Sequence, residues 1–162
     1  MKSKIRGVIV RPLSTFTDKR GMVIHMLRND DPNFTKFGEI YFATVRPNCV
    51  KAWHVHALMT LNYACIVGRI KLVLYAPEQG ILEEHYLEGS PLFSDYKLIT
   101  IPPGIWNGFK SEPIQMPNQN AMHFDAIVAN CSDRPHDKQE ITRIHPDNFN
   151  PKYDWGPYLE AG

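Results

Sequence analysis

Prolines and glycines interrupt this chain so often that little room is left for a long helix. Thirteen prolines and ten glycines are spread over 162 residues, and no stretch keeps a 3.6-residue apolar period over three turns. The intervening pieces are rich in Val, Ile, Tyr, Phe and Thr, which favour β-strands. The expected strands are 7–13, 22–27, 39–45, 50–56, 60–67, 70–75, 81–87, 96–101, 105–109, 121–129 and 140–144. About ten short strands of this kind predict an all-β fold, either a closed barrel or a jelly roll.

The strongest hairpin signal lies at residues 61–76, where Val67-Gly68-Arg69 joins two strands. Only residues 29–36 and the tail from Pro146 have the composition of helical turns or irregular segments. No repeat, linker or low-complexity stretch divides the chain. We therefore expect one β-barrel domain over residues 1–162, with few short helical turns.

Charge and cysteine usage limit the possible partners and the compartment. Eighteen Lys and Arg against 17 Asp and Glu give a formal charge of +1. This balance provides no broad positive potential that would attract nucleic acid or an anionic membrane. Cys49, Cys65 and Cys131 are too few and too scattered for a disulfide framework. The sequence has no secretion signal and no apolar run near the ~18 residues that span a bilayer. These features predict a cytoplasmic protein with no nucleic-acid or membrane partner.

Two of the seven histidines form the sequence His54-Val55-His56. Side chains two apart on a strand point to the same face, so this pair faces one interior together. A barrel interior of suitable width is a natural place for a small ligand. The alternative is that one histidine is a hydrogen-bonded core residue and the other lies at the rim.

A second motif, at residues 101–109, reads IPPGIWNGF. Proline and glycine here form a sharp turn before a new strand. Together with the upstream pair of histidines, this segment resembles the two motifs of the cupin superfamily of small β-barrels. In metal-binding cupins these motifs supply three His and one acidic residue, but two of those positions are Leu61 and Asn107 here.

A narrower resemblance extends over residues 8–147. Its motifs are FTDKRG at 16–21, VKAWH at 50–54, the turn at Val67-Gly68, and IPPG…GF at 101–109. In this order and spacing they resemble the dTDP-4-dehydrorhamnose 3,5-epimerase family. The resemblance implies a metal-free, cofactor-free and usually dimeric β-barrel enzyme that acts on a nucleotide-diphosphate-linked 4-keto-6-deoxyhexose. Strand 7–13, with its alternating apolar pattern, is the expected edge strand of a homodimer.

The resemblance also implies roles for individual residues. His54 matches the base that removes a proton next to the ketone. Arg20 matches an arginine that holds the diphosphate, and Lys51 replaces a second arginine, keeping the charge but losing the two-pronged fork. Phe16, in the first motif, is a further expected substrate contact.

Other family positions have changed. The lysine near the developing enolate is Leu61, the tyrosine acid aligns with Ile127, and a glutamate after the first motif is His25. The second-motif histidine is Asn107, and the late aspartate-bearing segment has no clear counterpart. Leucine cannot stabilise an oxyanion, so 3,5-epimerisation by the ordinary mechanism is not expected.

Polar residues elsewhere predict a rebuilt pocket. If strand 121–129 keeps the family register, His123 and Asp125 share the face of Ile127 and join His54 and His56. Asp125 would then orient a histidine, and Tyr63 would serve as the acid. His25, His56, His123 and Asn107 are the remaining expected substrate contacts. The alternative is that His123 and Asp125 form a structural pair near one end of the barrel.

Three functions remain open on these residues. The first is an epimerase or isomerase of a nucleotide-linked deoxysugar, in the biosynthesis of a surface polysaccharide or a sugar-decorated metabolite. The second is a non-catalytic barrel that still binds the sugar nucleotide. The third is a metal-dependent cupin that uses His54, His56 and a substitute ligand such as His123.

Overall fold

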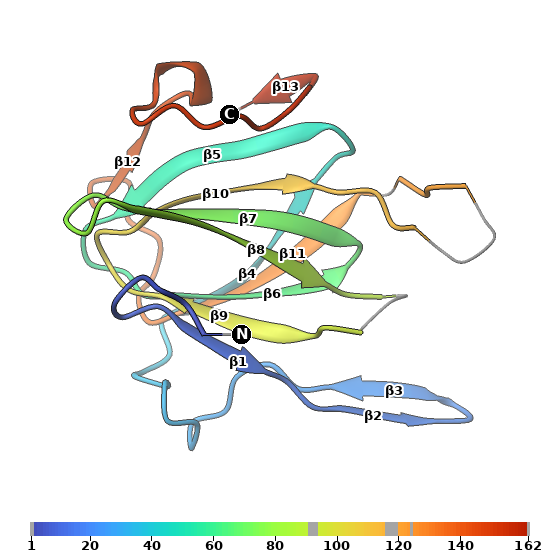
Figure 1. The fold of residues 1–162 in the computed structure, drawn as a ribbon. Coiled ribbons are helices and arrows are strands. Elements are labelled where there is room, and N and C mark those ends of the chain that lie inside the picture. The colour runs from blue at the N-terminus through green and yellow to red at the C-terminus, as the bar shows by residue number, and fades with distance from the viewer. Residues whose placement is uncertain (1, 91–93, 116–119, 124, 162) are drawn as a thin grey trace.

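Two antiparallel sheets face one another in the computed structural model, which describes residues 2–90, 94–115, 120–123 and 125–161 (Figure 1). The first sheet has the order β1-β9-β6-β11-β4 and the second β12-β5-β10-β7-β8, with β13 added parallel to β5. A separate hairpin, β2–β3, projects from the body. The strands are β1 (Ile9–Pro12), β2 (Thr15–Asp18), β3 (Gly21–Ile24), β4 (Glu39–Val45), β5 (Cys49–His56), β6 (Leu61–Val67), β7 (Arg69–Ala76), β8 (Ile81–Glu88), β9 (Lys97–Ile101), β10 (Trp106–Ser111), β11 (Ala126–Ser132), β12 (Ile141–Arg143) and β13 (Glu160–Ala161).

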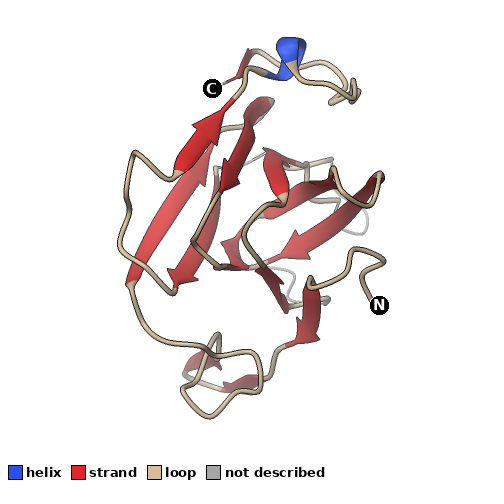
Figure 2. Ribbon diagram, turned by 90° about the vertical axis from the view of Figure 1, so that its left-hand side faces the viewer, coloured by secondary structure: helices blue, strands red, loops and turns tan. Residues whose placement is uncertain are grey.

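Helical structure is nearly absent from the described part of the chain. Its one helix is the 3-10 turn η1 (Pro146–Asn148), drawn in blue in Figure 2. Within the same ranges no helix is long and apolar enough to cross a membrane. The expected all-β jelly roll of the cupin type is confirmed, although the two sheets remain separate and do not close into a continuous barrel.

The main core lies between the facing sheets. Leu61 and Cys65 of β6 pack there with Leu72 and Leu74 of β7, and none of the four is more than 1% exposed. Two smaller clusters cover the outer faces. Leu13, Ile24, Met26 and Leu27 pack on the first sheet, and the C-terminal tail packs on the second. Several central strands are therefore buried on both sides, which explains their nearly continuous apolar sequences.

The predicted hairpin at residues 61–76 is wrong. The turn at Gly68, with a φ of +80°, takes the chain from β6 in one sheet to β7 in the other. The partner of β7 along the chain is β8 instead. Because β6 and β7 are both buried on two faces, their patterns do not reveal whether they pair side by side or lie in opposite layers.

Other differences concern the ends of elements. Residues 29–36 form turns and bends, the irregular alternative of the two that the sequence left open, whereas β2 was not anticipated. The strand expected at 121–129 begins only at Ala126 and continues to Ser132. This later start matters for the site, because it excludes two residues that the sequence placed in the pocket.

An irregularity in β5 orients the residues that follow. Asn107 of β10 pairs with His54 and Phe109 with Lys51, so Ala52 and Trp53 together face the single residue Gly108. An extra residue of this kind is a β-bulge, which locally shifts the alternation of side chains. Lys51 and His54 can therefore line one cavity despite being three residues apart.

We predict that Gly108→Ala destabilises the protein through this bulge. A Cβ at Gly108 would lie 2.2 Å from Cβ of Ala52, so we expect a loss of about 3 kcal/mol in the free energy of unfolding. The control is Gly80→Ala, where φ is +64° but nothing lies within 4 Å of the new Cβ; it should cost about 1 kcal/mol. Chemical denaturation measures both, and equal losses would contradict the prediction.

Candidate active site

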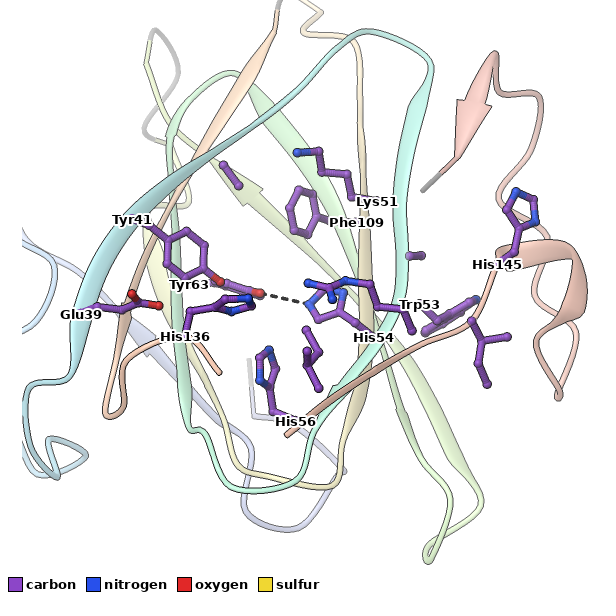
Figure 3. A pocket seen from close by; sticks show the side chains of 15 residues that line it. Glu39, Tyr41, Lys51, Trp53, His54, His56, Tyr63, Phe109, His136 and His145 are labelled. Carbon is purple, nitrogen blue, oxygen red and sulfur yellow. Dashed lines mark hydrogen bonds between the residues drawn. The ribbon is translucent and has the colours of Figure 1, made fainter. Parts of the chain in front are cut away.

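A cavity of about 670 Å³ opens between β5 and the facing strands β4 and β6 (Figure 3). Strand β10 and the segment around β12 complete its wall. Aromatic and imidazole groups make up much of the lining, and charged side chains add to it. The lining residues are Glu39, Tyr41, Ala43, Lys51, Ala52, Trp53, His54, His56, Tyr63, Phe109, His136, Ile141, Arg143, Ile144 and His145.

Strand β5 is held on both edges. On one side Asn107 of β10 lies opposite His54 and donates its Nδ2–H to the His54 carbonyl oxygen, at 3.2 Å. On the other, β12 places Ile141 opposite His56 and Arg143 opposite His54. Asn107 is fully buried and does not line the cavity. Its Nδ2 contacts the backbone carbonyl oxygens of His54 and Ile105 rather than the space a substrate would occupy.

The outer face of β5 is covered by the C-terminal tail. The Trp53 ring is stacked on Phe149, with centroids 4.3 Å apart. Lys110 of β10 reaches the same tail, and its Nζ donates to the carbonyl oxygens of Trp155 at 2.9 Å and Pro157 at 2.7 Å. The tail is thus packed on β5 through Trp53 and anchored to the neighbouring β10 through Lys110, which supports the inner face of the sheet from behind.

His54 meets Tyr63 across the cavity. Its Nε2 lies 3.3 Å from the Tyr63 hydroxyl, the contact that is dashed in Figure 3. Burial, together with the nearby His56 and Arg143, lowers the pKa of His54 to about 3. Burial and the neighbouring Tyr41 hydroxyl raise the pKa of Tyr63 well above its usual value. At neutral pH the pair is therefore an uncharged imidazole beside an uncharged phenol.

His56 has a different partner. Its Nδ1 contacts Oε1 of Glu140, and the two side chains are only 4% and 7% exposed. The other oxygen of Glu140 accepts the backbone N–H of Leu58 at 3.0 Å and of Met59 at 3.4 Å. Burial opposes ionisation of Glu140, but the hydrogen bonds from His56 and these amides leave its pKa below the usual value. Glu140 is thus a carboxylate aligned on His56.

The sequence analysis did not find Glu140, although it starts the strand expected at 140–144. No motif marks it, and 84 residues separate it from His56. It also missed several other lining residues: Glu39, Tyr41, His136, Arg143 and His145. The only available signal was their polarity in or beside predicted strands, which does not show where the strand lies in the fold.

The cavity has a mixed electrostatic lining. Lys51 and Arg143 are exposed and supply two positive charges to it. Glu39 brings a carboxylate, one oxygen of which is buried without a hydrogen-bond partner. Positive groups of this kind suit a phosphate or carboxylate, and the unpaired oxygen of Glu39 can accept a hydrogen bond from a hydroxyl or amide.

His123 and Asp125 are not brought to this cavity. Both are exposed and precede β11. Within β11, Ala126 and Val128 pack in the main core, whereas Ile127 lies opposite the exposed Thr44 of β4. The expected register is thus shifted by one residue, which reverses the face of every side chain. The proposed partnership of Asp125 with a pocket histidine is therefore absent.

Three other predicted contacts lie on or beside the β2–β3 hairpin. Phe16, Arg20 and His25 are exposed and outside the cavity of their own chain. Arg20 pairs with Asp18 at 2.6 Å, and the Phe16 ring meets His25 edge to face at 5.4 Å. Of the predicted residues, the fold brings together His54, His56, Tyr63 and Lys51.

The ligand set considered for a metal-dependent cupin is not assembled either. His54 and His56 are adjacent, with ring centroids 5.8 Å apart, but His123 is elsewhere. Over the described ranges, no three His, Cys, Asp or Glu side chains are grouped closely enough to share a metal ion. Glu140, the acidic group nearest this pair, is already engaged by His56 and two backbone amides.

We predict that His54 stays neutral across the physiological pH range. Since its pKa is lowered to about 3, its ring nitrogens should show no protonation shift between about pH 8 and about pH 5. The unfolded chain does take up this proton, so His54 contributes stability that is full above about pH 6.5 and is lost as pH falls towards 3. Nitrogen-15 NMR of the imidazoles checks this, with a histidine peptide as reference. A midpoint above pH 6 would contradict it.

Comparison with known proteins finds relatives that are named as a glycan biosynthesis epimerase and a dTDP sugar isomerase. No protein-family model matches it. It is 30% identical over 114 residues to the probable low-salt glycan biosynthesis epimerase Agl13 of Haloferax volcanii, covering 66% of this chain and 70% of that protein. A dTDP sugar isomerase from Desulfovibrio desulfuricans G20 is 40% identical, with a TM-score of 0.75 and coverage of 86% and 85%.

Structures of more distant proteins have the same fold. The dTDP-4-dehydrorhamnose 3,5-epimerase of Sulfolobus tokodaii superposes with a TM-score of 0.74 at 17% identity, covering 94% of this chain and 85% of that one. Together with the two relatives at 30% and 40% identity, this shared fold confirms the resemblance drawn from the sequence motifs. This chain belongs to the dTDP-4-dehydrorhamnose 3,5-epimerase-like family, as a divergent member.

Proposed function

We propose that the protein is an epimerase or isomerase of a nucleotide-diphosphate-linked 4-keto-6-deoxyhexose, acting in glycan or deoxysugar biosynthesis. The observation that carries the proposal is that two imidazoles and a buried phenol line one cavity. Two positively charged side chains, Lys51 and Arg143, line the same cavity. The similarity to a glycan biosynthesis epimerase and a dTDP sugar isomerase supports the substrate class. The three cysteines are free, in keeping with a reducing cytoplasm.

The chemistry follows from the acidity of a C–H bond beside a ketone. A histidine takes this proton, and the electron pair moves to the ketone oxygen to form an enolate. The family's lysine is replaced by Leu61, which is buried in the core. Tyr63, two residues along the same face of β6, offers an O–H to the enolate in place of that lysine. Lys51 and Arg143 are the groups suited to the diphosphate.

Proton exchange in heavy water tests the function. We expect wild-type protein to exchange the C3 or C5 protons of one sugar in a panel of dTDP-, GDP- and CDP-linked 4-keto-6-deoxyhexoses, followed by NMR. The His54→Asn/His56→Asn double variant should lose this exchange by at least about 1,000-fold. His123→Asn, which changes an exposed histidine outside the cavity, should match wild type.

The outcome also separates the proposal from the non-catalytic alternative, which the leucine at position 61 favours. Binding of a sugar nucleotide, measured by calorimetry, without exchange at either carbon would identify a binding protein instead. Exchange that survives in the double variant would show that the imidazoles are not responsible.

We further propose that the protein is a homodimer. β1 and β4 are the two edges of the first sheet, and an exposed edge favours pairing with another chain. β4 turns Ile40 and Phe42 outward at 52% and 64% exposure. The projecting hairpin adds Phe16 at 61%. A second copy that covers these surfaces would also give the exposed Arg20 and Phe16 an opportunity to contact substrate.

Light scattering at micromolar concentration should give about twice the chain mass of 18.6 kDa. Phe42→Asp should shift the protein towards the monomer, because it places a charge in the covered surface. Leu159→Asp, at a tail residue that is 82% exposed, is the matched control and should leave the mass unchanged. A wild-type mass near that of one chain would contradict the dimer.

A further inference from the structure

The two histidines of β5 are chemically unequal, although the sequence presents them as a pair. His54 contacts a phenol, whereas His56 contacts a carboxylate. Both line the same cavity, and their rings meet edge to face at 5.8 Å. The partners therefore decide what each imidazole can do.

Glu140 fixes the tautomer of His56. The carboxylate is held in place by the backbone amides of Leu58 and Met59, so it acts only as an acceptor. A neutral His56 must then carry its proton on Nδ1, the atom that contacts Glu140. Its Nε2 is left with a free lone pair, and the nearby negative charge stabilises the ring once it gains a proton. These are the properties of a general base.

His54 has the opposite properties. It faces Arg143 on β12 and His56 on its own strand, and among the residues that the structure describes no carboxylate is hydrogen-bonded to its ring. Burial and these neighbours keep the ring neutral, with its pKa lowered to about 3, so it is a weak base. A neutral imidazole and a phenol each carry one donor hydrogen; one of the two bridges the pair, and the other is left to bond an oxygen that becomes negative.

Within the proposed function, on which this step rests, we propose that His56 is the general base, that Glu140 is its positioning residue, and that the His54–Tyr63 pair donates a hydrogen bond to the substrate ketone. The C–H bond beside the ketone breaks, its proton goes to Nε2 of His56, and its electron pair forms the C=C bond of an enolate. The ketone π pair moves onto oxygen, where the donated hydrogen bond stabilises it. Return of a proton to carbon completes an epimerisation or an isomerisation.

This assignment moves the base from the position that the family resemblance implies, His54, to the histidine two residues further along the strand. The physical reason is the carboxylate, which reaches His56 and not His54. It also accounts for Leu61, because the pair formed by His54 and Tyr63 takes over the stabilisation that a lysine would supply.

The rate of proton exchange in heavy water, measured for single variants, distinguishes the roles of the four residues. His56→Asn should lower the exchange rate by at least about 1,000-fold, and His54→Asn and Tyr63→Phe by about 10- to 100-fold each.

Glu140→Gln should lower the exchange rate by about 10- to 100-fold, and Glu140→Asp should restore part of that loss. Glu78→Gln, at an exposed glutamate outside the cavity, should have no effect. Exchange that persists in His56→Asn but disappears in His54→Asn would overturn the assignment.

A second measurement needs no substrate. Nitrogen-15 NMR of the ligand-free protein should show His56 as the Nδ1–H tautomer, and Glu140→Gln should mix the two tautomers, whereas Glu78→Gln should not. An Nε2–H tautomer in wild type overturns the alignment by Glu140 even if the enzyme is active. Absence of exchange in wild type with every sugar defeats the proposed function itself, so the two failures are distinguishable. Glu140→Asp, which retains the charge, serves if Glu140→Gln does not fold.

Discussion

The arrangement of this site depends on how β5 is held. Hydrogen bonds to β10 and β12 secure its two edges, and the aromatic tail packs on its outer face through Trp53. Because three sides of the strand are fixed, its inner side chains occupy defined positions without a supporting helix. The bulge opposite Gly108 then sets which of them point inward, so that Lys51 lies in the same cavity as His54 and His56.

Burial makes the choice of neighbours decisive for each histidine. In a site of low dielectric, a charged imidazole is costly unless an acceptor balances it. Glu140 provides that balance for His56, whereas the partner of His54 among the described residues is the uncharged Tyr63. One strand thus carries two imidazoles with different partners, a carboxylate for His56 and a phenol for His54, a combination that supports acid–base chemistry at a single substrate carbon.

Much of the fold was predictable because it depends on local rules. Frequent proline and glycine excluded long helices, and β-branched and aromatic pieces marked most strands, with β4 predicted at its observed bounds. The predictions that failed also came from local patterns, which do not show how strands pair or which way they face. Both faces of β6 and β7 are buried, so their sequences did not reveal that Gly68 joins different sheets. The register assumed for strand 121–129 put Ile127 on the inner face and His123 and Asp125 with it, whereas β11 turns Ala126 and Val128 inward.

The sequence by itself determined the all-β jelly roll, the family, and the pair of histidines that share one strand face, because alternation along a strand is a property of adjacent residues. Only the tertiary structure decided what those histidines contact. Glu140 lies 84 positions from His56, and Arg143 reaches His54 through the pairing of β12 with β5. Proton affinity depends on charges within a few ångströms in space, and the distance between residues along the chain carries no information about such contacts.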